Sequence, residues 1–253
     1  MQNLPLLFVM SCLPFLLWGQ RPGANPLNKG NAVLVKLSYS AHMPGGDLET
    51  RFGNNFSFGA GADLITAKGN WLFGFDYAYL FGGNVKEDVL ASLRTPEGAI
   101  IGNNRGYADI TLRERGFYAG AHIGKLIGIG LPNPRSGIRV TVGAGLLQHK
   151  IRIQDDPASR VPQLDENYKK GYDRLSNGLA FTEFIGYQVM SMDKRVNFYA
   201  GFEFTQGFTL SRRDFNFDTR AKDETERTDL LFGIRVGWII PIYFGREAGE
   251  VYY

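Results

Sequence analysis

The chain has 253 residues, of which 32 are glycine and 34 are aromatic (19 Phe, 12 Tyr and 3 Trp). Charged residues make up 21% and the formal net charge is +3. This charge content excludes a bundle of membrane helices and a disordered chain, and the small, mixed charge gives no indication of nucleic-acid binding. The length suits one large domain or two small ones.

The first twenty residues read MQNLPLLFVMSCLPFLLWGQ, an apolar run followed by a polar segment. We expect residues 1–19 to be a signal peptide and residues 20–30 a periplasmic N-terminal segment. Cys12 is the single cysteine, and VMSC is similar to a lipoprotein cleavage site, but the apolar run continues through Leu17 and argues against lipidation. Past residue 18 no apolar run is long enough for a membrane helix, so an exported chain would be soluble or cross a membrane as a barrel.

Residues 70–83, NWLFGFDYAYLFGG, alternate strictly between two kinds of side chain. The even positions hold small residues, leucines and a single carboxylate, Asp76. A period of two is typical of a β-strand with two different faces. One face would meet lipid and the other the inside of a narrow barrel. The aromatic positions are Trp71, Phe73, Phe75, Tyr77, Tyr79 and Phe81.

Seven other segments show the same alternation: 32–41, 55–65, 116–128, 138–151, 178–190, 196–208 and 230–243. The segment 178–190 is irregular, because Glu183 shares its parity with Phe181 and Ile185. A β-bulge would repair its register and turn Glu183 inward. Interfacial girdles would include Trp71, Tyr79 and Trp238.

The connections alternate in length between the eight segments. Short ones span 66–70, 131–137 and 191–195, and long ones span about 42–53, 82–115, 154–177 and 209–229. The sequence therefore predicts an all-β fold, an eight-stranded antiparallel transmembrane up-and-down β-barrel over 31–243. Its long loops would be extracellular, its short turns periplasmic, and 244–253 a periplasmic tail. Ten strands remain an alternative, if AIIG and ADITL in the longest loop form a hairpin.

Ionisable residues of both signs fall on the inward parity. Because isolated charges in a low-dielectric interior are costly, we expect them to pair and to plug the lumen. The alternative is a conducting or proton-carrying path. The predicted network comprises Lys36, Asp63, Asp76, His122, Arg139, Glu203 and Arg235.

Enzyme signatures are weak in this chain. Ser40 and His42 share a strand face near the outer rim, as a lipid-modifying hydrolase would require, and His149 lies near the end of another strand. No metal-ligand spacing and no phosphate-binding loop occurs. We therefore expect no enzymatic activity, no cofactor and no metal.

Two long loops carry aromatic and basic residues of the kinds favoured at protein interfaces. The alternative is a solvated loop whose charges cancel. The candidate binding residues are Tyr168, Lys169, Lys170, Tyr172, Asp173, Arg174, Phe215 and Phe217.

Four features of the sequence are shared with a known family. They are the strands rich in glycine and aromatic residues, the WGQ that ends the first apolar run, the loop segment YKKGYDRLSNG and the final strand GWIIPIY. The chain resembles small outer-membrane β-barrels of the Bacteroidota, including the PorT and PorG groups associated with type IX secretion. The resemblance implies a non-enzymatic accessory subunit of an outer-membrane complex, with outer-membrane lipid, lipopolysaccharide and other surface proteins as partners. The alternatives are a transporter of small solutes or hydrophobic compounds and a lipid-modifying enzyme.

Overall fold

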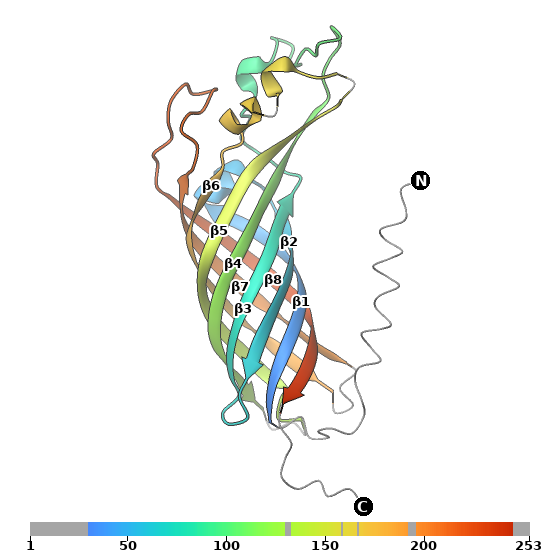
Figure 1. Cartoon of the computed structure of the whole chain (residues 1–253), viewed down its shortest axis with the longest axis vertical. Coiled ribbons are helices and arrows are strands. Elements are labelled where there is room, and N and C mark those ends of the chain that lie inside the picture. Colours follow the sequence, from blue (N-terminus) through green and yellow to red (C-terminus); the bar gives the residue numbers. More distant parts are fainter. Residues whose placement is uncertain (1–29, 130–132, 158, 166, 192–195, 245–253) are drawn as a thin grey trace, which may run out of the picture.

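A computed structural model describes residues 30–129, 133–157, 159–165, 167–191 and 196–244. Within these residues the chain forms one closed barrel in which each strand pairs antiparallel with its neighbours in sequence, and β8 closes on β1 (Figure 1). The all-β, up-and-down architecture predicted from the alternation is therefore confirmed, and so is the strand number of eight.

The strands are β1 (Asn31–Gly46), β2 (Asn55–Ile65), β3 (Trp71–Gly82), β4 (Ile110–Gly128), β5 (Gly137–Asp155), β6 (Ser176–Met190), β7 (Asn197–Ser211) and β8 (Arg227–Phe244). The short helices are α2 (Asp47–Arg51) and the 3₁₀ helices η1 (Ala91–Leu93), η2 (Pro162–Leu164) and η3 (Tyr168–Gly171).

The period of two sorts the side chains onto two surfaces, as expected for strands. Along β3, Phe75 and Tyr77 point outward and are exposed, whereas Leu72 and Leu80 point inward and are buried. On the outer wall Tyr39 stacks on Phe56. Large apolar side chains exposed around the whole barrel are suited to a lipid bilayer and not to water.

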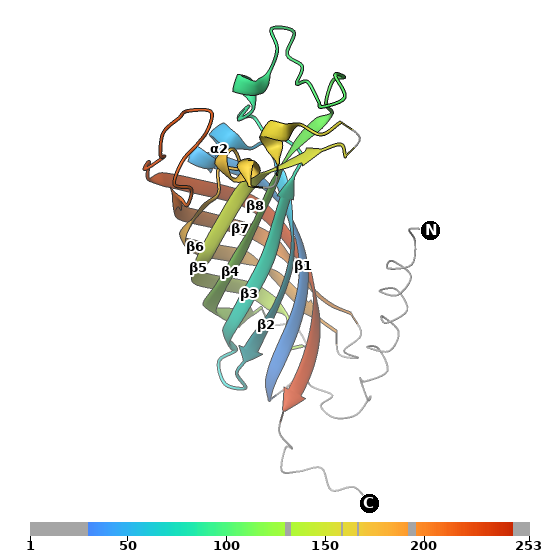
Figure 2. The same cartoon turned by 45° about the horizontal axis from the view of Figure 1, so that its top comes forward.

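The two ends of the barrel differ. The turn 66–70 is short, and β1 begins beside the end of β8 at the same end of the barrel, where Asn31 pairs with Phe244. The long loops gather at the other end (Figures 1 and 2). Among the described residues no helix has the length and hydropathy to span a bilayer.

Several strands run further toward the long loops than the sequence predicted. β1 continues to Gly46, β4 begins at Ile110, and β5 continues to Asp155. The alternation persists in these extensions, but charged residues weaken its apolar signal. The proposed extra hairpin is not formed as two strands: residues 101 and 107 make an isolated bridge, and 110–111 begin β4.

The predicted bulge in β6 was wrong. Glu183 pairs in continuous register with Val142 on β5 and Phe204 on β7, and its side chain is exposed on the outer wall. The lumen does not contain this carboxylate.

The long loops fold into a cap over the outer end of the barrel. Their buried apolar residues join those of the upper strands in one cluster, which includes Leu48, Phe52, Val89, Leu90, Val161, Leu164 and Tyr172. The cap is therefore a packed extension of the barrel core and not a set of independent loops.

The predicted signal peptide (1–19), nearly all of the N-terminal segment (20–30) and nearly all of the tail (244–253) lie outside the described residues. The same holds for Cys12 and for most of the turn 191–195.

Replacement of Gly61 by leucine should destabilise the barrel. A Cβ at this position would lie 2.2 Å from Asp76 Oδ1 and 2.6 Å from the Phe75 carbonyl oxygen, inside the filled lumen. We expect a loss of at least about 3 kcal/mol in the free energy of unfolding, measured by urea titration in lipid vesicles. Ala60→Leu is the matched control, since Ala60 is exposed on the outer face, and should be neutral. Equal stability of both variants would contradict a filled lumen.

Candidate functional site

Asp63 lies at the centre of the lower lumen and is fully buried. Its Oδ1 lies 2.7 Å from Lys36 Nζ and 2.8 Å from His122 Nε2, and Arg139 donates to its Oδ2. Gln188 accepts from the other arm of Arg139 at 3.0 Å. Three strands, β1, β4 and β5, thus direct polar groups at one carboxylate on β2, which fixes the register of these strands relative to one another.

A second group of charges lies beside it. Asp76 Oδ1 is 2.8 Å from Lys36 Nζ, and Asp76 Oδ2 is 3.6 Å from Arg235, which also donates to Glu203. Three cations (Lys36, Arg139, Arg235) therefore meet three carboxylates (Asp63, Asp76, Glu203). The formal charge of this set, with histidine neutral, is zero. All seven residues predicted for the lumen network face the interior and join through these contacts.

The polar chain continues upward through residues that the sequence analysis did not assign to the network. His42 Nε2 lies 2.7 Å from Glu203, and its Nδ1 lies 3.0 Å from Asn55, which donates to Glu114. His149 Nε2 lies 2.8 Å from Asp229, which also accepts from a threonine hydroxyl. The alternation within the expected strands already places Asn55 and His149 inside. Continuing it past the strand ends places His42, Glu114 and Asp229 inside as well.

Apolar layers bound the charged network. Leu34, Leu72 and Leu126 are buried in a cluster at the short-turn end, while Leu80 and Leu147 belong to the cluster that continues into the cap. An internal cavity between His42, Tyr118, Arg235 and their neighbours has a volume of about 20 Å³. That is room for about one water molecule, so this space offers no route for a solute.

Asp63, Asp76 and His122 come close enough to suggest a metal site. Each carboxylate oxygen already faces Lys36, His122 or an arginine, however, so a metal ion would have to displace cations that balance the charge. The residues present do not fit a divalent cation well.

The pairing of Ser40 and His42 considered for a hydrolase has a different environment. Both ring nitrogens of His42 are engaged, by Glu203 and by Asn55, and Ser40 is buried in the lumen. A nucleophile must reach its substrate, so this geometry offers no support for acyl transfer.

Ion pairs tie the loops of the cap together. Arg174 Nε donates to Glu87 at 2.8 Å, and its guanidinium also donates to both oxygens of Asp218. Burial alone would lower the pKa of Arg174, but the hydrogen bonds that it donates to Asp218 and Glu87 outweigh this effect and raise the pKa. Arg213 holds Asp173 through two hydrogen bonds of 2.8 and 2.5 Å.

The eight predicted loop residues divide into two groups. Tyr172, Asp173 and Arg174 are buried and make contacts within the cap, and Lys169 pairs with Asp155 at 2.7 Å. The exposed members are Tyr168, Lys170, Phe215 and Phe217. The first group supports the fold of the cap, and only the second offers a surface of any size to a partner.

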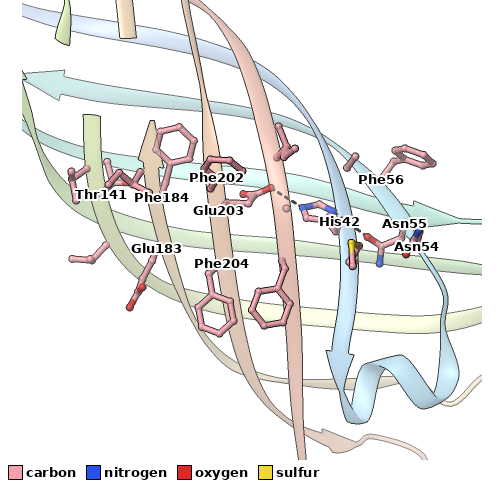
Figure 3. Close-up of a pocket in the computed structure, with 18 residues that line it drawn as sticks. His42, Asn54, Asn55, Phe56, Thr141, Glu183, Phe184, Phe202, Glu203 and Phe204 are labelled. Carbon is pink, nitrogen blue, oxygen red and sulfur yellow. Dashed lines mark hydrogen bonds and ion pairs between the residues drawn. The ribbon is translucent and has the colours of Figure 1, made fainter. Parts of the chain in front are cut away.

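Glu183 has an unusual environment for a carboxylate. It lies midway along β6, between exposed Phe181 and Ile185, and forms no ion pair with any described residue. A depression is lined by Glu183 and by apolar residues of the outer wall such as Phe204, together with polar lumen residues such as His42 and Glu203. Figure 3 shows that Glu183 and Phe204 point to the same side, away from the His42–Glu203 contact.

No family model matches the chain, and a search of curated proteins finds no match. The chain has remote similarity to several solved structures. Ail, the attachment invasion locus protein of Yersinia pestis, has a TM-score of 0.44 and 11% identity, covering 83% of this chain and 99% of that one. Neisserial surface protein A has a TM-score of 0.38 and 14% identity, covering 82% and 97%.

A mutant of the TodX monoaromatic hydrocarbon channel has a TM-score of 0.30 and 8% identity, covering 87% of this chain and 93% of that one. All three scores are below 0.5. The barrel assignment therefore rests on the strand pairing, and nothing about function follows from these likenesses.

Asp63→Asn should be strongly destabilising, because it removes the carboxylate that pairs with buried Arg139 and leaves buried Lys36 with Asp76 as its remaining partner. Removing one partner of a buried ion pair typically costs about 3–5 kcal/mol. The double variant Asp63→Asn/Arg139→Gln should recover part of that loss. Urea unfolding of the two single variants and the double variant measures the coupling, and strict additivity would contradict the network.

Glu183→Leu should stabilise the barrel in phosphatidylcholine vesicles by about 1–2 kcal/mol, since it removes an unpaired carboxylate from the lipid-facing wall. The control is Ile185→Leu, an apolar exchange on the same face of β6, which should have no effect. A loss of stability in Glu183→Leu would show instead that the carboxylate makes a favourable contact.

Proposed function

We propose that the protein is an outer-membrane barrel that serves as a non-enzymatic structural or accessory subunit of a larger outer-membrane complex. It would act through its extracellular cap and carry no solute through its lumen. The observation that carries this proposal is a preformed aromatic cluster, exposed on the cap above a filled barrel.

The cluster is centred on Phe217, whose ring centroid lies 5.9 Å from Tyr168, 5.9 Å from Phe215 and 5.5 Å from buried Tyr172. The exposed fractions are 55% for Tyr168, 45% for Phe215 and 37% for Phe217. Aromatic side chains with such large exposed fractions are typical of surfaces that bind another molecule.

The backbone holds the cluster in place. Phe217 N–H donates to the Gly171 carbonyl at 3.0 Å, and a Cβ at Gly171 would lie 2.1 Å from the Phe217 ring. Aromatic side chains with fixed positions lose little conformational entropy on binding, which favours affinity. A protein partner with an apolar surface fits this cluster best.

The resemblance to Bacteroidota barrels supports a role in secretion or assembly at the outer membrane. The apolar wall supports the outer membrane as the location, since strands of alternating polarity in a closed barrel are typical of it. In that setting outer-membrane lipid and lipopolysaccharide are direct neighbours of the wall.

A second candidate is transport of a small hydrophobic compound, and the depression beside Glu183 is the observation that favours it. The small internal cavity argues against a continuation of this route through the lumen. Planar-bilayer conductance should therefore remain at the background level.

Purification of the tagged protein from its native outer membrane in mild detergent should retain a stoichiometric partner. Tyr168→Ser/Phe215→Ser should reduce its recovery at least about tenfold, because exposed aromatic residues at interface centres often contribute more than 1–2 kcal/mol each. Tyr107→Ser is the matched control, since Tyr107 is an aromatic loop residue with 77% exposure that is not part of this cluster. A lone barrel, or equal loss in the control, would contradict the proposed role of the cap.

A further inference from the structure

At the outer rim of the barrel, β4 and β5 continue together as an extension, formed by residues 110–115 and 150–155. At its base β3 still pairs with Arg115 and Glu114 of β4, whereas β6 pairs with β5 only as far as His149. Among the described strands, residues 110–113 and 150–155 therefore have no third strand beside them. Figures 1 and 2 show the extension rising from the barrel wall into the cap.

The two faces of the extension have opposite chemistry. The inner face carries Ile151 and Ile153, which are buried in the apolar cluster of the cap, with Leu112 packed against them. The outer face carries a set of four cations, which we term the basic patch: Arg113, Arg115, Lys150 and Arg152.

The strand register places these cations directly opposite one another. Arg113 pairs with Arg152, and Arg115 pairs with Lys150. Like charges at directly opposed positions, with Cβ atoms about 5 Å apart, destabilise a sheet. None of the four forms an ion pair with a described carboxylate; the guanidinium of Arg115 donates to the Glu114 carbonyl at 2.6 Å. Within the part of the chain that the structure describes, the positive charge of the patch therefore has no carboxylate counter-ion.

The height of the basic patch indicates what supplies the counter-ion. Arg115 pairs with Phe81, and Phe117 stacks on Tyr77 one strand step below, at a centroid distance of 6.0 Å. Two residues along a strand advance about 7 Å, so the patch begins one step beyond Phe117 and level with Phe81, at the upper edge of the apolar wall and on the same face. In a bilayer this is the level of the lipid headgroups.

We infer that the basic patch is a binding site for the phosphate groups of an outer-leaflet lipid whose acyl chains lie against the wall below it. Arginine offers paired N–H donors that match phosphate oxygens, and a phosphate between opposed cations would relieve their repulsion. The inference rests on the outer-membrane location proposed above, but it is independent of the proposed subunit role.

The test uses the full-length barrel, purified in a zwitterionic detergent, and diphosphoryl lipid A as the probe. Arg113→Gln/Arg152→Gln should weaken lipid A binding at least about tenfold, the loss expected for removal of one or two charged contacts to phosphate. Lys86→Gln/Lys222→Gln is the control, because it removes the same charge from exposed cap residues that already pair with Glu49 and Glu224. The control should bind as the wild type does.

Thermal unfolding provides a second measurement, in which a variant that merely fails to fold would not give the expected result. Without lipid, Arg113→Gln/Arg152→Gln should unfold at a higher temperature than the wild type, since the repulsion is gone. With lipid A the order should reverse. The absence of this reversal would overturn the inference.

The source of the phosphate is settled by competition. Dephosphorylated lipid A should bind weakly, and inorganic phosphate should fail to displace diphosphoryl lipid A. Complete displacement by inorganic phosphate would show a general anion site and overturn the lipid assignment. A barrel that binds lipid A but has no protein partner would refute only the subunit role, whereas an inert patch on a barrel with partners would refute only this inference.

Discussion

The neutral set of three cations and three carboxylates around Asp63 is the constraint on which the barrel depends. Lys36, Arg139 and Arg235 would each be costly if buried alone, and each is balanced by a carboxylate from another strand. Because the groups come from different strands, their contacts fix the register of the sheet. Backbone hydrogen bonds alone would not specify it in this way. The same network fills the space through which a solute would pass, so stability and closure of the lumen have one cause.

Glycine is the counterpart of these long polar side chains. A Cβ at Gly74 would meet Asp63 and His122 at 2.3 and 2.7 Å, and one at Gly237 would meet the ring of Tyr199 at 2.4 Å. An eight-stranded lumen has room for one layer of side chains, so a strand that contributes a large residue requires a neighbour that contributes none. The high glycine content therefore makes room for the large polar side chains of the lumen. The many glycines and the buried charges thus have the same origin, the narrow space inside the barrel.

The sequence predicts the faces of this barrel well because a strand has only two of them. Parity placed Asp63, Asp76 and Arg139 inside without knowledge of their partners. Parity alone also shows that Glu183 faces outward, and the expected bulge arose from the assumption that a carboxylate must avoid lipid. The cap is different: the burial of Tyr172 and the pairing of Arg174 with Glu87 and Asp218 join loops distant in sequence. No periodic pattern in the sequence encodes such contacts. The sequence analysis therefore had only the residue types of these loops to use, and it predicted an exposed binding surface.

The outer wall changes its chemistry with height, and this order links the proposed roles of the protein. Apolar and aromatic side chains cover the barrel wall, which we assign to the acyl chains. The basic patch follows at the proposed headgroup level, and the aromatic cluster of Phe217 lies on the cap above. Each level exposes one kind of group that the described residues do not satisfy by themselves. If lipid phosphates hold the β4–β5 extension at the membrane surface, they also fix the height of the cap, because Ile151 and Ile153 on the inner face of the extension are part of its core. A partner protein would then meet the aromatic cluster at a defined distance from the bilayer, so lipid binding on one face would position the protein contact on another.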